Sequence, residues 1–179
     1  MCGIICATFS ATAPPKEWPT RWNGSPISLK SADNRDTIAA SPKLPAATGL
    51  EVPWHQDGQY WPITPLKTVT LRIAIDGSTA ANGCMRYVPG SHRESALLEH
   101  AVQLRDDYAI KQEIPDVDES LAADCVLEPG QISLHDVYLI HGSNPNTSGK
   151  RRADYAVRYM PANALYDRSP QHPATVYAA

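Results

Sequence analysis

The fold of this chain is decided by a strand and the turn after it, Thr68-Val69-Thr70-Leu71-Arg72-Ile73-Ala74-Ile75-Asp76 and Asn82-Gly83. Apolar side chains alternate along the first part and share one face, which is the pattern of a β-strand; they are Val69, Leu71, Ile73 and Ile75. Asn-Gly is a strong turn signal, and a short strand from Cys84 to Val88 follows it. This region is therefore predicted to be a pair of β-strands.

The rest of the chain continues this pattern of short strands and Gly/Pro turns. Further strands are predicted near 123–127, 131–134, 137–140 and 153–160. One main helix is predicted over 91–104, with Ser91 as its N-cap and Glu94 closing a capping box. Many short strands with one or two short helices indicate an all-β sandwich or barrel.

Composition favours a globular protein with one domain. The chain has 179 residues, of which 42% are hydrophobic and 20% charged, and both fractions are ordinary for such proteins. A net charge of −3 without a basic block argues against nucleic-acid or membrane partners. We expect residues 1–47 to be irregular and poorly packed, 48–165 to form the core, and 166–179 to be an irregular tail.

Cysteine usage favours the cytoplasm. The four cysteines show no zinc-binding spacing, and unpaired thiols are typical of a reducing compartment. The oligomeric state is not predicted by the sequence.

Two histidines and an aspartate are the candidate metal ligands. His55 and Asp57 are two positions apart, so on a strand both side chains project from one face. His141 offers a third ligand, and Arg152 follows eleven positions later. Two histidines with one carboxylate suit Fe(II) that keeps open positions, and the planar fork of arginine suits a carboxylate of a chelating dicarboxylate. Each feature also has a simpler explanation, namely a solvated turn, a hydrogen-bonded histidine or a basic run.

Four ordered motifs carry a family resemblance. Residues 52–161 resemble the phytanoyl-CoA dioxygenase family of Fe(II)/2-oxoglutarate oxygenases, particularly its small microbial members. The matching stretches are Val52-Pro53-Trp54-His55-Gln56-Asp57-Gly58, Asn82-Gly83-Cys84-Met85-Arg86-Tyr87-Val88-Pro89-Gly90-Ser91-His92, Leu134-His135-Asp136, and His141-Gly142-Ser143 with Asn146 and Arg152. Members of this family usually carry a longer region before the first ligand, so we expect an N-terminally shortened chain.

The resemblance implies a double-stranded β-helix, the cupin-like jelly-roll of two facing sheets. It assigns His55, Asp57 and His141 to iron, and Arg152 with Ser143 to 2-oxoglutarate. It also implies O2 as a reactant, with 2-oxoglutarate leaving as succinate and CO2 and the substrate usually hydroxylated. The carboxylate at Asp57 favours hydroxylation over halide transfer, while desaturation and ring closure stay open.

Two other histidines are expected to have structural roles. His135 competes with His141 for the place of third ligand, but Gly142-Ser143 and the spacing to Arg152 fit only His141. His92 is expected to brace the loop after the Pro-Gly turn.

The resemblance implies a small-molecule substrate, and we expect a secondary metabolite or a lipid-like acid. Gln59, Tyr60 and Trp61 are expected to line the mouth of the pocket, with packing at a sheet edge as the alternative for Trp61. Arg72 on the inner face could bind an anionic group of the substrate or cosubstrate. On the outer face, which we favour, it is an ordinary solvated arginine.

Two alternative functions remain open from the sequence. One is a catalytically silent or truncated family member with a scaffold role. The other is a zinc-dependent hydrolase on a cupin-like barrel, which would leave Arg152 without a function.

Overall fold

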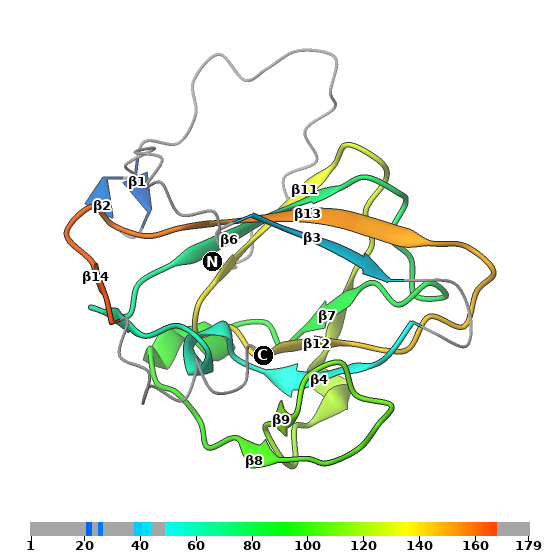
Figure 1. The fold of residues 1–179 in the computed structure, drawn as a ribbon, viewed down its shortest axis with the longest axis horizontal. Helices are drawn as coiled ribbons and strands as arrows, with labels where there is room; N and C mark the ends of the chain where they lie inside the picture. The colour runs from blue at the N-terminus through cyan, green and yellow to red at the C-terminus, as the bar shows by residue number, and fades with distance from the viewer. Residues whose placement is uncertain (1–20, 23–24, 27–37, 44–48, 168–179) are drawn as a thin grey trace.

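The computed structural model describes residues 21–22, 25–26, 38–43 and 49–167. Two four-stranded antiparallel sheets face each other (Figure 1), with strand orders β10-β7-β12-β4 and β11-β6-β13-β3. The first sheet contains β4 (Val52–His55), β7 (Met85–Tyr87), β10 (Ala123–Cys125) and β12 (His141–Ser143). The second contains β3 (Ile38–Lys43), β6 (Val69–Ala74), β11 (Ile132–Asp136) and β13 (Arg152–Tyr159).

Smaller elements complete the described fold. Three two-stranded ribbons pair β1 (Arg21–Trp22) with β2 (Ser25–Pro26), β5 (Ile63–Thr64) with β14 (Leu165–Tyr166), and β8 (Ala101–Val102) with β9 (Gln112–Glu113). Within the residues that the structure describes, the helical turns are of the 3-10 type: η2 (Asp57–Gln59), η3 (Ser91–Glu94) and η4 (Glu119–Leu121). The predicted all-β jelly-roll is confirmed. Among the residues placed by the structure, no helix is long and apolar enough to cross a membrane.

The predicted helix over 91–104 is wrong. Only Ser91–Glu94 is helical, and Ser95 ends the turn with a φ of 49°. The backbone beyond it is held by Gln56, whose side-chain amide donates to the Ala96 carbonyl and accepts from the Leu98 N–H. Ser91 does not cap the turn, because its hydroxyl donates to the Val88 carbonyl. A tertiary contact therefore satisfies backbone groups that a helix would otherwise pair.

Two further predictions of local structure need correction. Residues 137–140 form a turn, so His141 begins strand β12 where a strand was expected to end. Strand β3 lies inside the segment 1–47 that we expected to be irregular, and its backbone pairs along β13 from Arg152 to Val157. Within the same segment, Ser25–Pro26 also forms a short strand. The proposed division of the chain at residues 47 and 165 stays a prediction.

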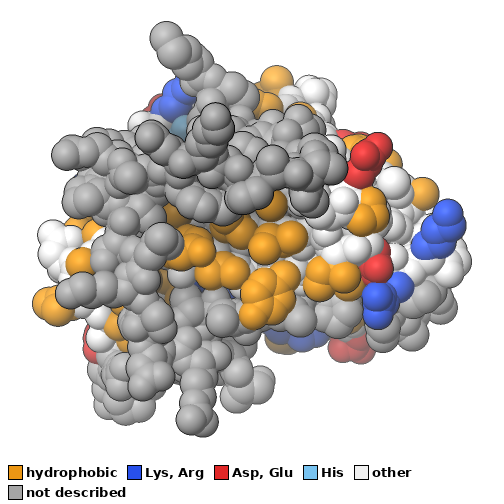
Figure 2. Space-filling view, turned by 90° about the horizontal axis from the view of Figure 1, so that it is seen from above, with side chains coloured by type: hydrophobic (Ala, Val, Ile, Leu, Met, Phe, Trp, Pro, Cys, Tyr) orange, Lys and Arg blue, Asp and Glu red, His pale blue; other side chains and the backbone are white. Residues whose placement is uncertain are grey.

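The second sheet has a polar inner face and an apolar outer face. Cross-strand pairs on the inner face join polar side chains: Arg72 with Ser133, Thr70 with His135, and Thr70 with Arg158. Pairs on the outer face join apolar ones: Leu71 with Leu134, Leu71 with Val157, and Ile73 with Tyr155. Figure 2 views the molecule from above and shows hydrophobic side chains gathered on that side.

A small apolar core separates the sheets next to the polar groups. It contains the buried side chains of Ala74, Met85, Cys125 and Leu127, with Tyr87 packed against them. Because this core is small, part of the space between the sheets is left to charged and metal-ligating groups. The inner faces of both sheets therefore build the candidate site.

Candidate metal and cosubstrate site

Three buried side chains from two neighbouring strand ends bring their ligand atoms together. His55 ends β4 and Asp57 opens η2, while His141 begins β12 and pairs directly with His55. One ligand atom from each lies within 4.8 Å of the others. Asp57 Oδ1 is 3.9 Å from His55 Nε2 and 3.8 Å from His141 Nε2. The structure thus brings together the three residues that the sequence singled out.

His55 and His141 both direct Nε2 toward the place where the three ligand atoms converge. His55 Nδ1 lies 2.8 Å from the Pro53 carbonyl oxygen, and His141 Nδ1 lies 2.9 Å from the Leu139 carbonyl oxygen. A carbonyl only accepts, so each Nδ1 carries the proton and each Nε2 keeps a free lone pair. Burial lowers the pKa of His55, and burial together with His55 holds the pKa of His141 well below its usual value. Both rings are therefore neutral near pH 7, as a metal ligand requires.

The two oxygens of Asp57 have different surroundings. Oδ2 accepts from the Thr70 hydroxyl at 2.9 Å and from His135 Nε2 at 3.3 Å, and Arg158 Nε lies 3.9 Å away. Oδ1 faces the two histidines. Burial opposes ionisation, but the hydrogen bond from His135 and the nearby charge of Arg158 hold the pKa of Asp57 well below its usual value. The carboxylate is charged and oriented, with one oxygen directed at the metal position.

This donor set fits Fe(II). Two imidazole nitrogens and one carboxylate oxygen, clustered on one side, are the ligands that mononuclear non-haem iron takes when other positions stay open for reactants. His135 belongs to the layer behind the ligands, because its Nε2 contacts the ligand Asp57. Outer partners of this kind orient ligands and tune metal affinity. The sequence assigned His135 a structural role but did not identify Asp57 as its partner.

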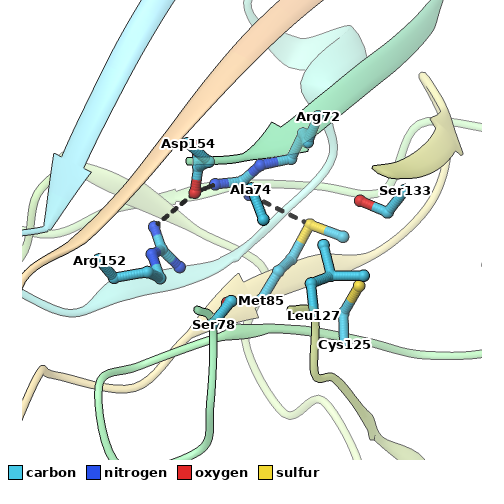
Figure 3. A pocket seen from close by; sticks show the side chains of 9 residues that line it. All are labelled: Arg72, Ala74, Ser78, Met85, Cys125, Leu127, Ser133, Arg152 and Asp154. Carbon is cyan, nitrogen blue, oxygen red and sulfur yellow. Dashed lines mark hydrogen bonds and ion pairs between the residues drawn. The ribbon is translucent and has the colours of Figure 1, made fainter. Parts of the chain in front are cut away.

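Arg152 lies in a pocket between the sheets (Figure 3), lined by Arg72, Ala74, Ser78, Met85, Cys125, Leu127, Ser133, Arg152 and Asp154. It is the first residue of β13 and only 4% exposed. Its Nη1 donates to the Gly83 carbonyl at 2.6 Å, and its Nη2 lies 3.3 Å from Asp154 Oδ2. Within the described residues, Arg152 Nε and Ser133 Oγ are buried without a hydrogen-bond partner. These groups could hold the distal carboxylate of a dicarboxylate such as 2-oxoglutarate.

The other predicted site residues, Ser143 and 59–61, do not line the Arg152 pocket. Ser143 is buried on β12 but is not among the residues that line the Arg152 pocket. The ring of Tyr60 meets the ring of His55 edge to face at 5.9 Å. Arg158 stacks over Trp61 at 4.8 Å from the ring centre. Tyr60 and Trp61 thus flank the ligand cluster, whereas Gln59 is half-buried at the end of η2.

Arg72 was expected to point outward, and that expectation is wrong. Its guanidinium lies on the inner face, donates from Nη2 to Asp154 Oδ2 at 2.5 Å, and approaches Met85 Sδ at 3.3 Å. The sequence also missed Asp154 and Arg158 as site residues. Both share the strand parity of Arg152 on β13, and this shared parity was the signal that could have placed them on its face.

The family model described as "Phytanoyl-CoA dioxygenase (PhyH)" matches residues 26–153. A probable alpha-ketoglutarate-dependent hypophosphite dioxygenase of Stutzerimonas stutzeri is 32% identical over 121 residues, covering 65% of this chain and 42% of that protein. An ectoine dioxygenase of Sphingopyxis alaskensis is 28% identical over 141 residues, covering 69% of this chain and 44% of that protein. The chain therefore spans less than half the length of both curated relatives.

Solved structures show the same architecture at similar identity. The non-heme monooxygenase ThoJ in its apo form has a TM-score of 0.61 at 30% identity, covering 72% of this chain and 46% of that one. EvdO2 from Micromonospora carbonacea var. aurantiaca, complexed with 2-oxoglutarate, has a TM-score of 0.60 at 29% identity, covering 77% and 57%. The family match extends over more than half of the chain, and the fold and the ligand cluster agree with it. This chain belongs to the phytanoyl-CoA dioxygenase family.

Proposed function

We propose that this chain is an Fe(II)- and 2-oxoglutarate-dependent dioxygenase that hydroxylates a small organic molecule. The observation that carries the proposal is the convergence of His55, Asp57 and His141, with ligand atoms within 4.8 Å of one another. The buried Arg152 in a pocket on the inner face of the facing sheet supports a role for a dicarboxylate cosubstrate.

Each residue has a defined task under this proposal. His55 Nε2, His141 Nε2 and Asp57 Oδ1 hold the iron, and Arg152 holds the distal carboxylate of 2-oxoglutarate. Iron and 2-oxoglutarate together supply the oxidation, in which one oxygen atom of O2 enters the substrate as hydroxyl and the other enters succinate as CO2 is lost. The protein supplies alignment and shields the reactants from water.

The substrate class is proposed from the relatives and from the surroundings of the ligands. Relatives are named for oxidation of hypophosphite and of ectoine, which are small polar molecules. On this chain, Tyr60, Trp61 and Arg158 flank the ligand cluster. Aromatic faces and one cation suit a compact substrate with a polar or anionic group, and a secondary metabolite or a small acid fits this description.

We propose the cytoplasm as the compartment. Cys84 is buried and forms no disulfide within the described part of the chain, and such a thiol together with a ferrous centre is consistent with a reducing environment.

Anaerobic addition of Fe(II) and then 2-oxoglutarate tests the proposed function. We expect a weak visible charge-transfer band that needs both additions, that His141→Ala abolishes, and that the matched variant His92→Ala keeps. Metal binding without any effect of 2-oxoglutarate would favour a zinc-type hydrolase. Failure to bind metal would favour a silent scaffold.

A further inference from the structure

The cosubstrate pocket contains a second guanidinium, that of Arg72 (Figure 3). It reaches the pocket from β6, whereas Arg152 reaches it from β13. Both guanidinium groups contact one atom, Asp154 Oδ2, at 2.5 Å from Arg72 Nη2 and 3.3 Å from Arg152 Nη2. The three charged groups therefore form one cluster, in which a single carboxylate is shared by two cations.

The cluster has a surplus of one positive charge. Arg72, Arg152 and Asp154 have side chains that are only 16%, 4% and 8% exposed. A buried charge without compensation is unfavourable, so the pocket is electrostatically matched to an anion with one negative charge. The distal carboxylate of a five-carbon 2-oxo dicarboxylic acid has that charge.

Without Arg72 the cluster would have no net positive charge left for a bound anion. Asp154 would then neutralise Arg152, and a bound carboxylate would leave the pocket with an uncompensated negative charge. Arg72 removes this conflict because it forms the shorter contact with Asp154, which leaves the charge of Arg152 available. The unpartnered donors Arg152 Nε and Ser133 Oγ lie in the same pocket and can bond the incoming oxygens.

We propose that Arg72 is a specificity-determining residue for the cosubstrate, which neutralises Asp154 so that Arg152 can bind the distal carboxylate of the 2-oxoacid. The proposal rests on the proposed function, because it assumes that Arg152 holds 2-oxoglutarate. It adds that affinity depends on the summed charge of three residues from two strands and not on Arg152 alone.

A double-mutant cycle tests the charge balance. The variants are Arg72→Met, Asp154→Asn and the combination of both, and the readout is the Kd of 2-oxoglutarate for the Fe(II)-loaded protein without oxygen. In Arg72→Met the Asp154 carboxylate neutralises Arg152, so the bound carboxylate lacks a charge partner. Loss of a buried charge partner should raise Kd at least about thirtyfold. The double variant has no Asp154 charge left to neutralise, and its Kd should return to within about threefold of the parent value.

Two controls separate charge from packing. Arg151→Met removes an exposed arginine that pairs with Asp76 at the surface, and it should leave Kd unchanged. 2-Oxopentanoate has the length of 2-oxoglutarate but no distal carboxylate, and Arg72→Met should not weaken its binding further. A structural defect would instead weaken both ligands.

The outcomes separate a failure of the role proposed for Arg72 from a failure of the proposed function. If the parent protein binds no 2-oxoglutarate, the proposed function fails. If the parent binds but Arg152→Met leaves Kd unchanged, the role of Arg152 is wrong, and the inference about Arg72 fails with it. If the parent protein binds and the double variant is as weak as Arg72→Met, or Arg72→Met equals the parent, only the role of Arg72 is overturned. Should Arg72→Met not fold, the double variant and Arg72→Lys decide: retained binding in both supports the charge balance, and loss in either overturns it.

Discussion

Gly142 lies so close to Val52 on the neighbouring strand that a β-carbon added at Gly142 would come within 2.8 Å of the Val52 carbonyl oxygen. The neighbour is backbone, so it cannot move aside as a flexible side chain would. This approach lies next to the direct pairing of His141 with His55. A glycine after the third ligand therefore lets β12 and β4 pack closely enough for the two histidines to meet.

We expect Gly142→Ala to destabilise the fold by about 1–3 kcal/mol, since overpacking a tight contact costs about that much. Fe(II) affinity should fall as well, because the strands that carry both histidines are forced apart. Urea unfolding and metal titration measure the two effects. Gly149→Ala is the matched control: nothing lies within 4 Å of its added β-carbon, and its stability should stay within about 0.5 kcal/mol. Equal behaviour of the two variants would contradict the packing argument.

His135→Ala should keep one metal site per chain but weaken it. Its imidazole holds Asp57 Oδ2 and faces the ligand cluster from behind. Loss of such an outer partner typically reduces metal affinity about 10- to 100-fold, whereas His141→Ala should eliminate specific binding. Anaerobic Fe(II) titration compares the two variants. A complete loss of metal in His135→Ala would mean that His135 is itself a ligand.

Arg152→Met should bind iron like the parent and lose affinity for 2-oxoglutarate. Its guanidinium is buried in the pocket between the sheets. If this pocket holds the distal carboxylate as proposed, truncating the buried charge partner should raise Kd at least about thirtyfold. Anaerobic titration of the Fe(II)-loaded protein provides the measurement. Arg151→Met, one residue earlier and exposed, is the control and should bind both ligands normally. Parental affinity in Arg152→Met would disprove the assigned role.

Gln56→Leu should loosen the segment after η3. The Gln56 amide makes three hydrogen bonds, donating to the carbonyls of Ala96 and Tyr138 and accepting from the Leu98 N–H. Leaving such buried groups unsatisfied costs about 1–3 kcal/mol. Denaturant unfolding measures the loss, and hydrogen exchange at the Leu98 amide should become faster. Gln59→Leu is the matched control, and slow exchange at Leu98 in Gln56→Leu would show that other contacts hold the segment.

The phenol of Tyr60 should lose its proton at a higher pH than an exposed tyrosine does. Burial and the negative charge of Asp57 raise the pKa of Tyr60 from 10.0 to about 12. Because the folded-state pKa is the higher one, the stability that this group contributes is complete below pH 10 and is lost as the pH rises through about 12. The difference in ultraviolet absorbance between the parent and Tyr60→Phe isolates this titration. A midpoint near pH 10 would mean that Tyr60 is more exposed to water than the structure shows.

The sequence predicted the strands and the ligands because both depend on short spacings. Alternation located β6 and β13, and the Asn82-Gly83 turn located β7. The i, i+2 spacing brought His55 and Asp57 together as candidates, although Asp57 lies in η2, beyond the end of β4, and not on the strand itself. Alternation defines two faces of a strand but does not say which one is inside. In β6 the inner face is the polar one, since the space between the sheets contains charged groups, and Arg72 was misplaced for this reason.

Contacts between distant segments were beyond the reach of local patterns. The pairing of His135 with Thr70, which brings both side chains to Asp57, depends on the register between β11 and β6. The predicted helix after Ser91 failed for a related reason. Its capping signals are local, whereas the amide of Gln56, more than 30 residues earlier, fixes the backbone in another conformation.

The divided surroundings of the Asp57 carboxylate have a consequence for metal capture. Hydrogen bonds to Oδ2, and the backbone contacts of both Nδ1 atoms, restrict all three ligands without any help from a metal. The entropy of aligning them is thus lost when the chain folds, and an arriving ion meets a preorganised chelate. Capture should therefore involve little rearrangement, and substitutions that loosen the fold far from the ligands should weaken iron retention in proportion to the order they remove.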